Sequence, residues 1–169
     1  MSTFVSVGNL KKPFVRLLQA VSDNVGILPG PVIVQHGHSP FHDRNCTAVP
    51  FLKMEEFQQR VADAAVVILH GGAGSIITAL QAGKKPIVMA RRASLDEHVD
   101  EHQQELVREL SAAGRILVAD DPASLREAVE SARAASRSAG SSGKRVRTRM
   151  EELVASDLES WATDVKEHR

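Results

Sequence analysis

The sequence predicts an α/β fold: a doubly wound, Rossmann-like parallel sheet of about six strands, followed by an amphipathic helix at the C-terminus. Short, continuously apolar runs alternate with longer segments in which apolar residues recur at helical spacing. Continuously apolar strands are typical of parallel sheets covered by helices on both faces. A chain of 169 residues, 43% hydrophobic and 25% charged, can bury one core of ordinary size.

The first half of the chain supplies three predicted strands and two predicted helices. FVSV at 4–7 and VIVQH at 32–36 are clear strand candidates, whereas TAVPF at 47–51 is weaker because it contains a proline. A helix is predicted over 13–21, where Pro13 suits the first turn and the following apolar residues share one helical face. Apolar residues at the same spacing across 57–64 predict the second helix.

The second half repeats the alternation. Its predicted strands are 66–69, 86–90 and 115–119. Its predicted helices are 75–82, 97–112 and one that begins at Asp121-Pro122. The long helix should turn Val99, Leu106, Val107 and Leu110 inward and end at Gly114.

The composition changes after Glu130, which ends the domain predicted over residues 1–130. Residues 131–149 contain six basic residues and no acidic one, so 131–145 is predicted to be a basic, Ser/Gly-rich linker. Residues 146–169 place apolar side chains, including the single tryptophan, along one helical face. This predicts an amphipathic helix, which packs either on its own domain or on a partner.

Charge and cysteine content exclude several functional classes. Twenty-one basic residues balance 21 acidic ones, so net charge gives no reason to expect a nucleic-acid partner. The single cysteine, Cys46, precludes an internal disulfide, and the first residues lack the basic and apolar regions of a secretory signal. No apolar run approaches the roughly 20 residues that span a bilayer. We therefore expect a cytoplasmic protein with no membrane span of its own.

The segment HGGAGS at 70–75 is the strongest candidate for a binding site. It joins a predicted strand to a predicted helix, where free backbone N–H groups and the helix dipole favour an anion such as a diphosphate. The same kind of glycine turn also serves close packing alone. It matches neither the P-loop nor the dinucleotide fingerprint, and the chain has no G-x-S-x-G esterase elbow. An ATPase, a dehydrogenase and an esterase are therefore not predicted.

A series of motifs resembles the donor-binding half of GT-B glycosyltransferases, the glycosyltransferase family 28 C-terminal domain. The motifs are VSVGN, PFVRLLQAV, VIVQHGHS, FLKMEEF, HGGAGS, ALQAGKKPIVMARR and EHVDEHQQELVREL. They lie in order over about residues 4 to 130. The chain is most similar to the small soluble subunit of two-subunit enzymes, namely the dolichol-linked N-acetylglucosaminyltransferase of eukaryotes and the exopolysaccharide glucuronosyltransferases of bacteria.

This resemblance implies that a UDP-sugar binds as a substrate and that no cofactor is needed. The residues it implies around the diphosphate are His70, Gly71, Gly72, Gly74 and Ser75. Gly8 and Asn9 would line the same cleft, and His102 and Gln103 would contact the donor sugar. Thr78 stands where related enzymes often carry a glutamate that holds the ribose hydroxyls.

The resemblance further implies an inverting glycosyltransferase assembled from different subunits. A membrane-associated partner would hold the lipid-linked or polysaccharide acceptor and place this chain at the inner face of the membrane. No metal is expected, because the helix N-terminus, Ser75 and His70 can stabilise the departing diphosphate. His70 suits phosphate binding better than the role of general base, which we expect in the partner.

Three alternatives stay open beside this interpretation. In the first, the chain is a non-catalytic regulatory subunit that binds a nucleotide sugar. In the second, it forms a homo-oligomer through the exposed half of the cleft. A self-sufficient hydrolase or epimerase is less favoured, because half of the cleft is missing.

Other polar residues have simpler interpretations. A histidine-rich run is interrupted by a proline and a strand end, so it is interpreted as a polar loop and not as a zinc site. Its candidate ligands are His36, His38, His42 and Cys46. His98 and His102, four residues apart on the predicted helix, suit a solvated face. Arg91 and Arg92 follow a predicted strand and have two interpretations. They bind a phosphate or a sugar carboxylate, or they are exposed charges at the strand end.

Overall fold

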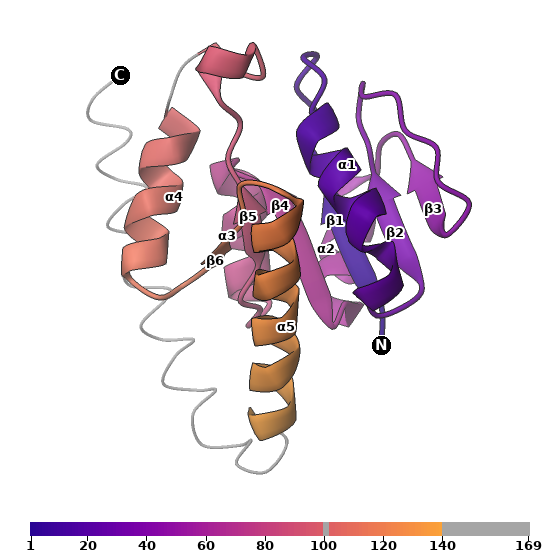
Figure 1. The fold of residues 1–169 in the computed structure, drawn as a ribbon, viewed down its shortest axis with the longest axis vertical. Helices are drawn as coiled ribbons and strands as arrows, with labels where there is room; N and C mark the ends of the chain where they lie inside the picture. Colours follow the sequence, from indigo (N-terminus) through magenta and orange to yellow (C-terminus); the bar gives the residue numbers. More distant parts are fainter. Residues whose placement is uncertain (100–101, 140–169) are drawn as a thin grey trace.

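A single six-stranded sheet forms the centre of the protein (Figure 1). The computed structural model describes residues 1–99 and 102–139. The strand order is β3-β2-β1-β4-β5-β6, and every neighbouring pair is parallel. This confirms the predicted doubly wound α/β class. The amphipathic helix predicted over 146–169 lies outside the described residues.

All six predicted strands are present, and most are shorter than predicted. They are β1 (Thr3–Ser6), β2 (Val32–Gln35), β3 (Cys46–Val49), β4 (Val66–His70), β5 (Ile87–Met89) and β6 (Leu117–Val118). The central strand β1 pairs Thr3 with Val32 on one side and with Val66 on the other. The edge strand β3 ends directly before Pro50, which cannot donate a ladder hydrogen bond.

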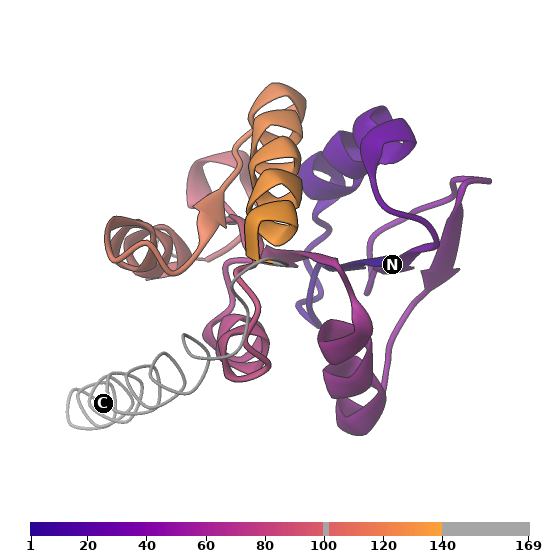
Figure 2. The same cartoon turned by 90° about the horizontal axis from the view of Figure 1, so that it is seen from below.

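Helices cover both faces of the sheet. They are α1 (Val15–Asn24), α2 (Met54–Asp63), α3 (Ala73–Gln81), α4 (His102–Ala112) and α5 (Pro122–Ala139), with the 3-10 turns η1 (Val25–Ile27) and η2 (Ala93–Leu95). In Figure 2, α1 and α5 lie on one face, and α2 and α3 lie on the other. Neighbouring strand residues pack on opposite faces: Val5 packs toward α1 and α5, and Phe4 packs toward α2.

The predicted helix at 97–112 begins later than expected. Asp96 adopts a left-handed conformation with φ 55° after η2, residues 97–99 are not helical, and α4 starts at His102. Val99, predicted to face inward, is 75% exposed, whereas Val107 is buried and Leu106 and Leu110 pack against the same cluster. The sequence pattern was therefore right for the helix itself and wrong for the loop that precedes it.

Helix α5 continues past the boundary predicted at residue 131. Its last nine residues fall within the segment 131–145 that was predicted to be a linker. Ala132 packs against the main core, and Arg133 donates a hydrogen bond to the carbonyl of Ile27 at 3.0 Å. Alanine and arginine are strong helix formers, so packing and propensity outweigh the basic composition there. The remaining residues of the predicted linker lie outside the described ranges.

In the described ranges, none of the helices combines the length and the apolar character that crossing a bilayer requires.

A substitution at Leu125 tests how much α5 contributes to the stability of the core. Its side chain is completely buried, whereas Leu95 in η2 is 53% exposed. We expect Leu125→Ala to lower the free energy of unfolding by about 2–5 kcal/mol, because it leaves a cavity. Leu95→Ala should change it by less than about 0.5 kcal/mol. Urea unfolding of both variants measures the difference, and equal small losses would show that α5 does not stabilise the core.

Candidate functional site

A cavity of about 250 Å3 lies at the carboxyl edge of the sheet, where β1, β2 and β4 end. Ligands in parallel α/β sheets bind at this edge. Seven of the site residues predicted from the sequence line the cavity: Gly8, Asn9, His70, Gly72, Gly74, Ser75 and Thr78. The fold therefore brings together two loops that are more than sixty positions apart in the chain.

The imidazole of His70 is held between two glycine backbones. A Cβ atom on Gly8 would lie 2.5 Å from Nε2 of His70, and one on Gly72 would lie 2.3 Å from the same atom. Gly8 also has a φ of +75°, which side chains rarely adopt. Both positions thus require glycine, and the ring that they enclose reaches the cavity from the end of β4.

The N-terminus of α3 faces the cavity. Gly72 is the N-cap residue, and no side chain there accepts a hydrogen bond from the first turn. Gly74 and Ser75, both in that turn, line the cavity. Free N–H groups and the positive end of the helix dipole make such a place suited to an anion.

Thr78 lies one turn further along α3. Its hydroxyl donates a hydrogen bond to the carbonyl of Gly74 at 2.9 Å. The proton of this hydroxyl is therefore already used within the helix, and toward the cavity the side chain offers oxygen lone pairs and a methyl group.

Burial and, to a smaller extent, the positive charge of Arg91 lower the pKa of His70 to about 4. The imidazole is therefore neutral at pH 7. A neutral ring donates one hydrogen bond and accepts one, so toward a phosphate it acts by hydrogen bonding and carries no positive charge. The same low pKa makes it a weak general base near neutral pH.

Arg91 is completely buried behind the site, and neither interpretation offered from the sequence is right. Its guanidinium donates hydrogen bonds to four backbone carbonyls, those of Val7, Lys12, Pro13 and Glu97, at 2.8–3.3 Å. It also lies over the ring of Phe14, 4.7 Å from the ring centroid. Burial lowers its pKa to about 10, so the group stays protonated at neutral pH and joins the loop after β1 to the loop after η2.

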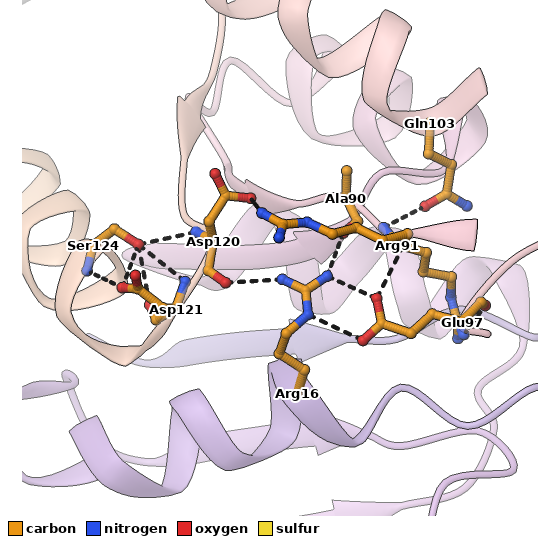
Figure 3. Close-up of polar contacts among 9 residues, drawn as sticks. Arg16, Ala90, Arg91, Glu97, Gln103, Asp120, Asp121 and Ser124 are labelled. Carbon is orange, nitrogen blue, oxygen red and sulfur yellow. Dashed lines mark hydrogen bonds and ion pairs between the residues drawn. The ribbon is translucent and has the colours of Figure 1, made fainter. Parts of the chain in front are cut away.

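A second arginine completes this cluster (Figure 3). Arg16 of α1 binds both carboxylate oxygens of Glu97, at 3.0 and 2.7 Å, and also donates to the carbonyl of Ala90. Arg92, in contrast, pairs with Asp120 at the surface. The strand-end arginines thus have structural partners of their own, and neither lines the cavity.

Two residues predicted to bind the ligand lie outside the cavity lining. Oε1 of Gln103 accepts a hydrogen bond from the backbone N–H of Arg91 at 3.2 Å. Gly71 is buried against Gln103, since a Cβ atom on Gly71 would lie 3.0 Å from that oxygen. The structure places His102 at the start of α4 but does not describe its side chain.

Sequence reasoning missed two polar residues at the floor of the cavity, Ser6 and Gln35. Each is the last residue of its strand, directly after apolar residues, and both are buried. A polar residue at the end of a buried strand was the signal in the sequence, because a buried polar group requires a hydrogen-bond partner. Gln35 donates to Oδ1 of Asn9 at 3.1 Å.

The histidine-rich run forms a loop at the same edge of the sheet. Nδ1 of His36 lies 2.8 Å from the carbonyl oxygen of Ser39, and the ring of His38 packs edge-on against Phe51. Across residues 1–99 and 102–139, no three side chains of the metal-binding types are grouped to hold an ion.

Comparison with known families assigns the chain. The family model for the glycosyltransferase family 28 C-terminal domain matches residues 3–156. The chain belongs to this family. No match was found among curated proteins.

Solved structures share the fold of this family 28 domain at low sequence identity. The glycosyltransferase of kitacinnamycin is 17% identical with a TM-score of 0.64, and the match covers 98% of the present chain and 42% of that protein. CalG4, the calicheamicin glycosyltransferase, is 22% identical with a TM-score of 0.62, and the match covers 96% and 43%. SnogD from Streptomyces nogalater is 18% identical with a TM-score of 0.51, and the match covers 90% and 43%. The chain therefore spans less than half the length of these structures.

Arg91 is expected to stabilise the family 28 domain strongly. Arg91→Met leaves four backbone carbonyls without their donor, so we expect the free energy of unfolding to fall by at least about 3 kcal/mol. Arg92→Met removes only a surface ion pair and should cost no more than about 1 kcal/mol. Chemical denaturation of the two variants measures both effects, and a tolerated Arg91→Met would contradict the proposed structural role.

The pKa of His70 predicts a loss of stability in acid. Between about pH 6.5 and pH 4 the unfolded chain binds a proton at His70 that the folded protein does not bind, so stability falls as pH falls through this range. From pH 7 to pH 4.5 the wild type should lose about 2 kcal/mol more than His70→Gln. Urea unfolding at both pH values measures this. His38→Gln, at an exposed loop position, should behave as the wild type, and parallel curves for all three proteins would refute the assignment.

Proposed function

We propose that this chain is the donor-binding subunit of a heteromeric inverting glycosyltransferase that uses a nucleoside diphosphate sugar, with UDP as the nucleotide. The cavity at the carboxyl edge carries the proposal, because it combines the free N-terminus of α3 with the close-approach glycines and a neutral histidine. This arrangement suits a diphosphate. Membership of family 28 supports a glycosyltransferase role for the domain.

We further propose a partner subunit. In this proposal the acceptor half of the cleft belongs to another protein, which docks beside the donor cavity. This partner is membrane-associated in our proposal and holds a lipid-linked or polysaccharide acceptor, which would place this chain at the inner face of the membrane.

The edge that carries the cavity also exposes apolar side chains suited to a partner. Leu10 follows β1, and Leu95 and Val99 belong to the loop before α4. An ion pair between Lys12 and Asp96 joins these two loops. Exposed apolar groups beside a binding site are typical of protein contact surfaces, so this edge is where we place the acceptor subunit.

The mechanism divides the chemistry between the two subunits. The first turn of α3, Ser75 and His70 stabilise the negative charge that develops on the departing diphosphate. Among the residues described, the cavity lining includes neither aspartate nor glutamate. Because His70 has a pKa of about 4, we place the base that deprotonates the acceptor hydroxyl in the partner.

Titration calorimetry with UDP tests the donor site. We expect the wild type to bind UDP and Ser75→Ala to bind it about 10-fold more weakly, because one hydrogen bond to a charged oxygen is lost. Ser111→Ala, on α4 and outside the cavity lining, is the matched control and should bind as the wild type. Absence of UDP binding at millimolar concentration would refute the proposal.

Transfer activity then separates an enzyme subunit from a regulatory one. A labelled UDP-sugar is added to membranes of the source cells with and without the purified chain, and label is measured in lipid and polysaccharide. We expect the wild-type chain to stimulate the transfer of label. Val99→Glu should lose this stimulation and keep the UDP affinity of the wild type. UDP binding without any transfer would favour the non-catalytic regulatory subunit, and self-association through the same edge would favour a homo-oligomer.

A further inference from the structure

A chain of hydrogen bonds runs along the floor of the cavity. The backbone N–H of Gly8 donates to Oγ of Ser6 at 3.2 Å, and Oγ of Ser6 donates to Oε1 of Gln35 at 3.0 Å. Nε2 of Gln35 then donates to Oδ1 of Asn9 at 3.1 Å. Ser6 and Gln35 are buried, whereas Asn9 is exposed and lines the cavity.

Burial of Ser6 determines which group donates and which accepts in this series of hydrogen bonds. The hydroxyl of Ser6 is fully buried and must donate its proton, and in the described part of the structure the acceptor it reaches is Oε1 of Gln35. The amide of Gln35 is thereby oriented, so its nitrogen must face Asn9. Oδ1 of Asn9 consequently accepts, and among the described residues no acceptor binds the Nδ2 group of Asn9, which can donate two hydrogen bonds.

We propose that Ser6 and Gln35 are positioning residues that orient Asn9 so that its amide N–H groups bind an anionic oxygen of the diphosphate. This inference rests on the proposed function, since it names a further contact in the same donor site. Asn9 and the first turn of α3 both line the cavity, so the diphosphate would receive donors from two segments: the loop after β1 and the first turn of α3.

The chemistry of the site explains why an amide is suited to this position. An aspartate has the same shape as Asn9 and could still accept the hydrogen bond from Gln35, but its second oxygen would face the ligand with a negative charge. Gln35→Leu would remove the hydrogen bond to Oδ1 of Asn9 and so allow the amide of Asn9 to rotate. The two changes therefore affect binding through one group, Nδ2 of Asn9.

UDP affinity measured by calorimetry tests this inference. We expect Asn9→Ala to weaken UDP binding about 10-fold, because a hydrogen bond to a charged oxygen is lost. Asn9→Asp should weaken it further, and high salt should reduce that additional loss because it screens the like charges. Asn45→Asp, at an exposed loop position, is the matched control and should leave the affinity unchanged.

A double-mutant cycle separates positioning from a general structural effect. Gln35→Leu should weaken UDP binding in the wild type and have almost no effect in the Asn9→Ala background, because it acts through Asn9. Ser6→Ala provides a smaller change with the same expected coupling, and circular dichroism confirms that each variant is folded. Losses of UDP affinity that add in the double variant, or an unchanged affinity in Asn9→Ala, would overturn this inference. The proposed donor site would still stand as long as the wild type binds UDP. Failure of the wild type to bind UDP would overturn both.

Discussion

The buried guanidinium of Arg91 is the interaction on which the arrangement of the site depends. A buried cation is tolerated only where hydrogen bonds replace its water, and here four backbone carbonyls do so. Three of them belong to the segment between β1 and α1, and the fourth belongs to Glu97. Any rearrangement of either loop would leave the charge unsolvated, so both loops are held at one edge of the sheet.

The site uses this rigidity in two ways. The loop that carries Gly8 and Asn9 is held against His70, whose ring fits only because Gly8 and Gly72 lack side chains. The charge of Arg91 also helps to keep His70 neutral. The structure thus places a fixed cation behind the cavity and neutral donors at its surface, a combination that favours an anion and needs little reorganisation when it binds.

Local sequence patterns predicted a helix or a strand correctly where the residues of that element alone decide its structure. The alternation of apolar strands with amphipathic segments gave all six strands and the five helices, and the glycine loop pointed to the N-terminus of α3. The errors fall where distant contacts outweigh local composition. Residues 97–99 read as helix but form a loop in which Glu97 binds Arg16 of α1. Residues 131–139 read as linker but continue helix α5, and Ala132 packs against the core.

The sequence by itself determined the fold class, the family resemblance and the glycine loop that follows β4, because hydrophobic period and glycine positions are local properties. Only the tertiary structure decided which polar groups meet. Gln35 reaches Asn9 across 26 positions, and Arg91 reaches Val7 across 84. Such pairs arise from the parallel order of the strands, which aligns chain segments far apart in sequence, and burial of Gln35 and Arg91 requires that their polar groups find partners there.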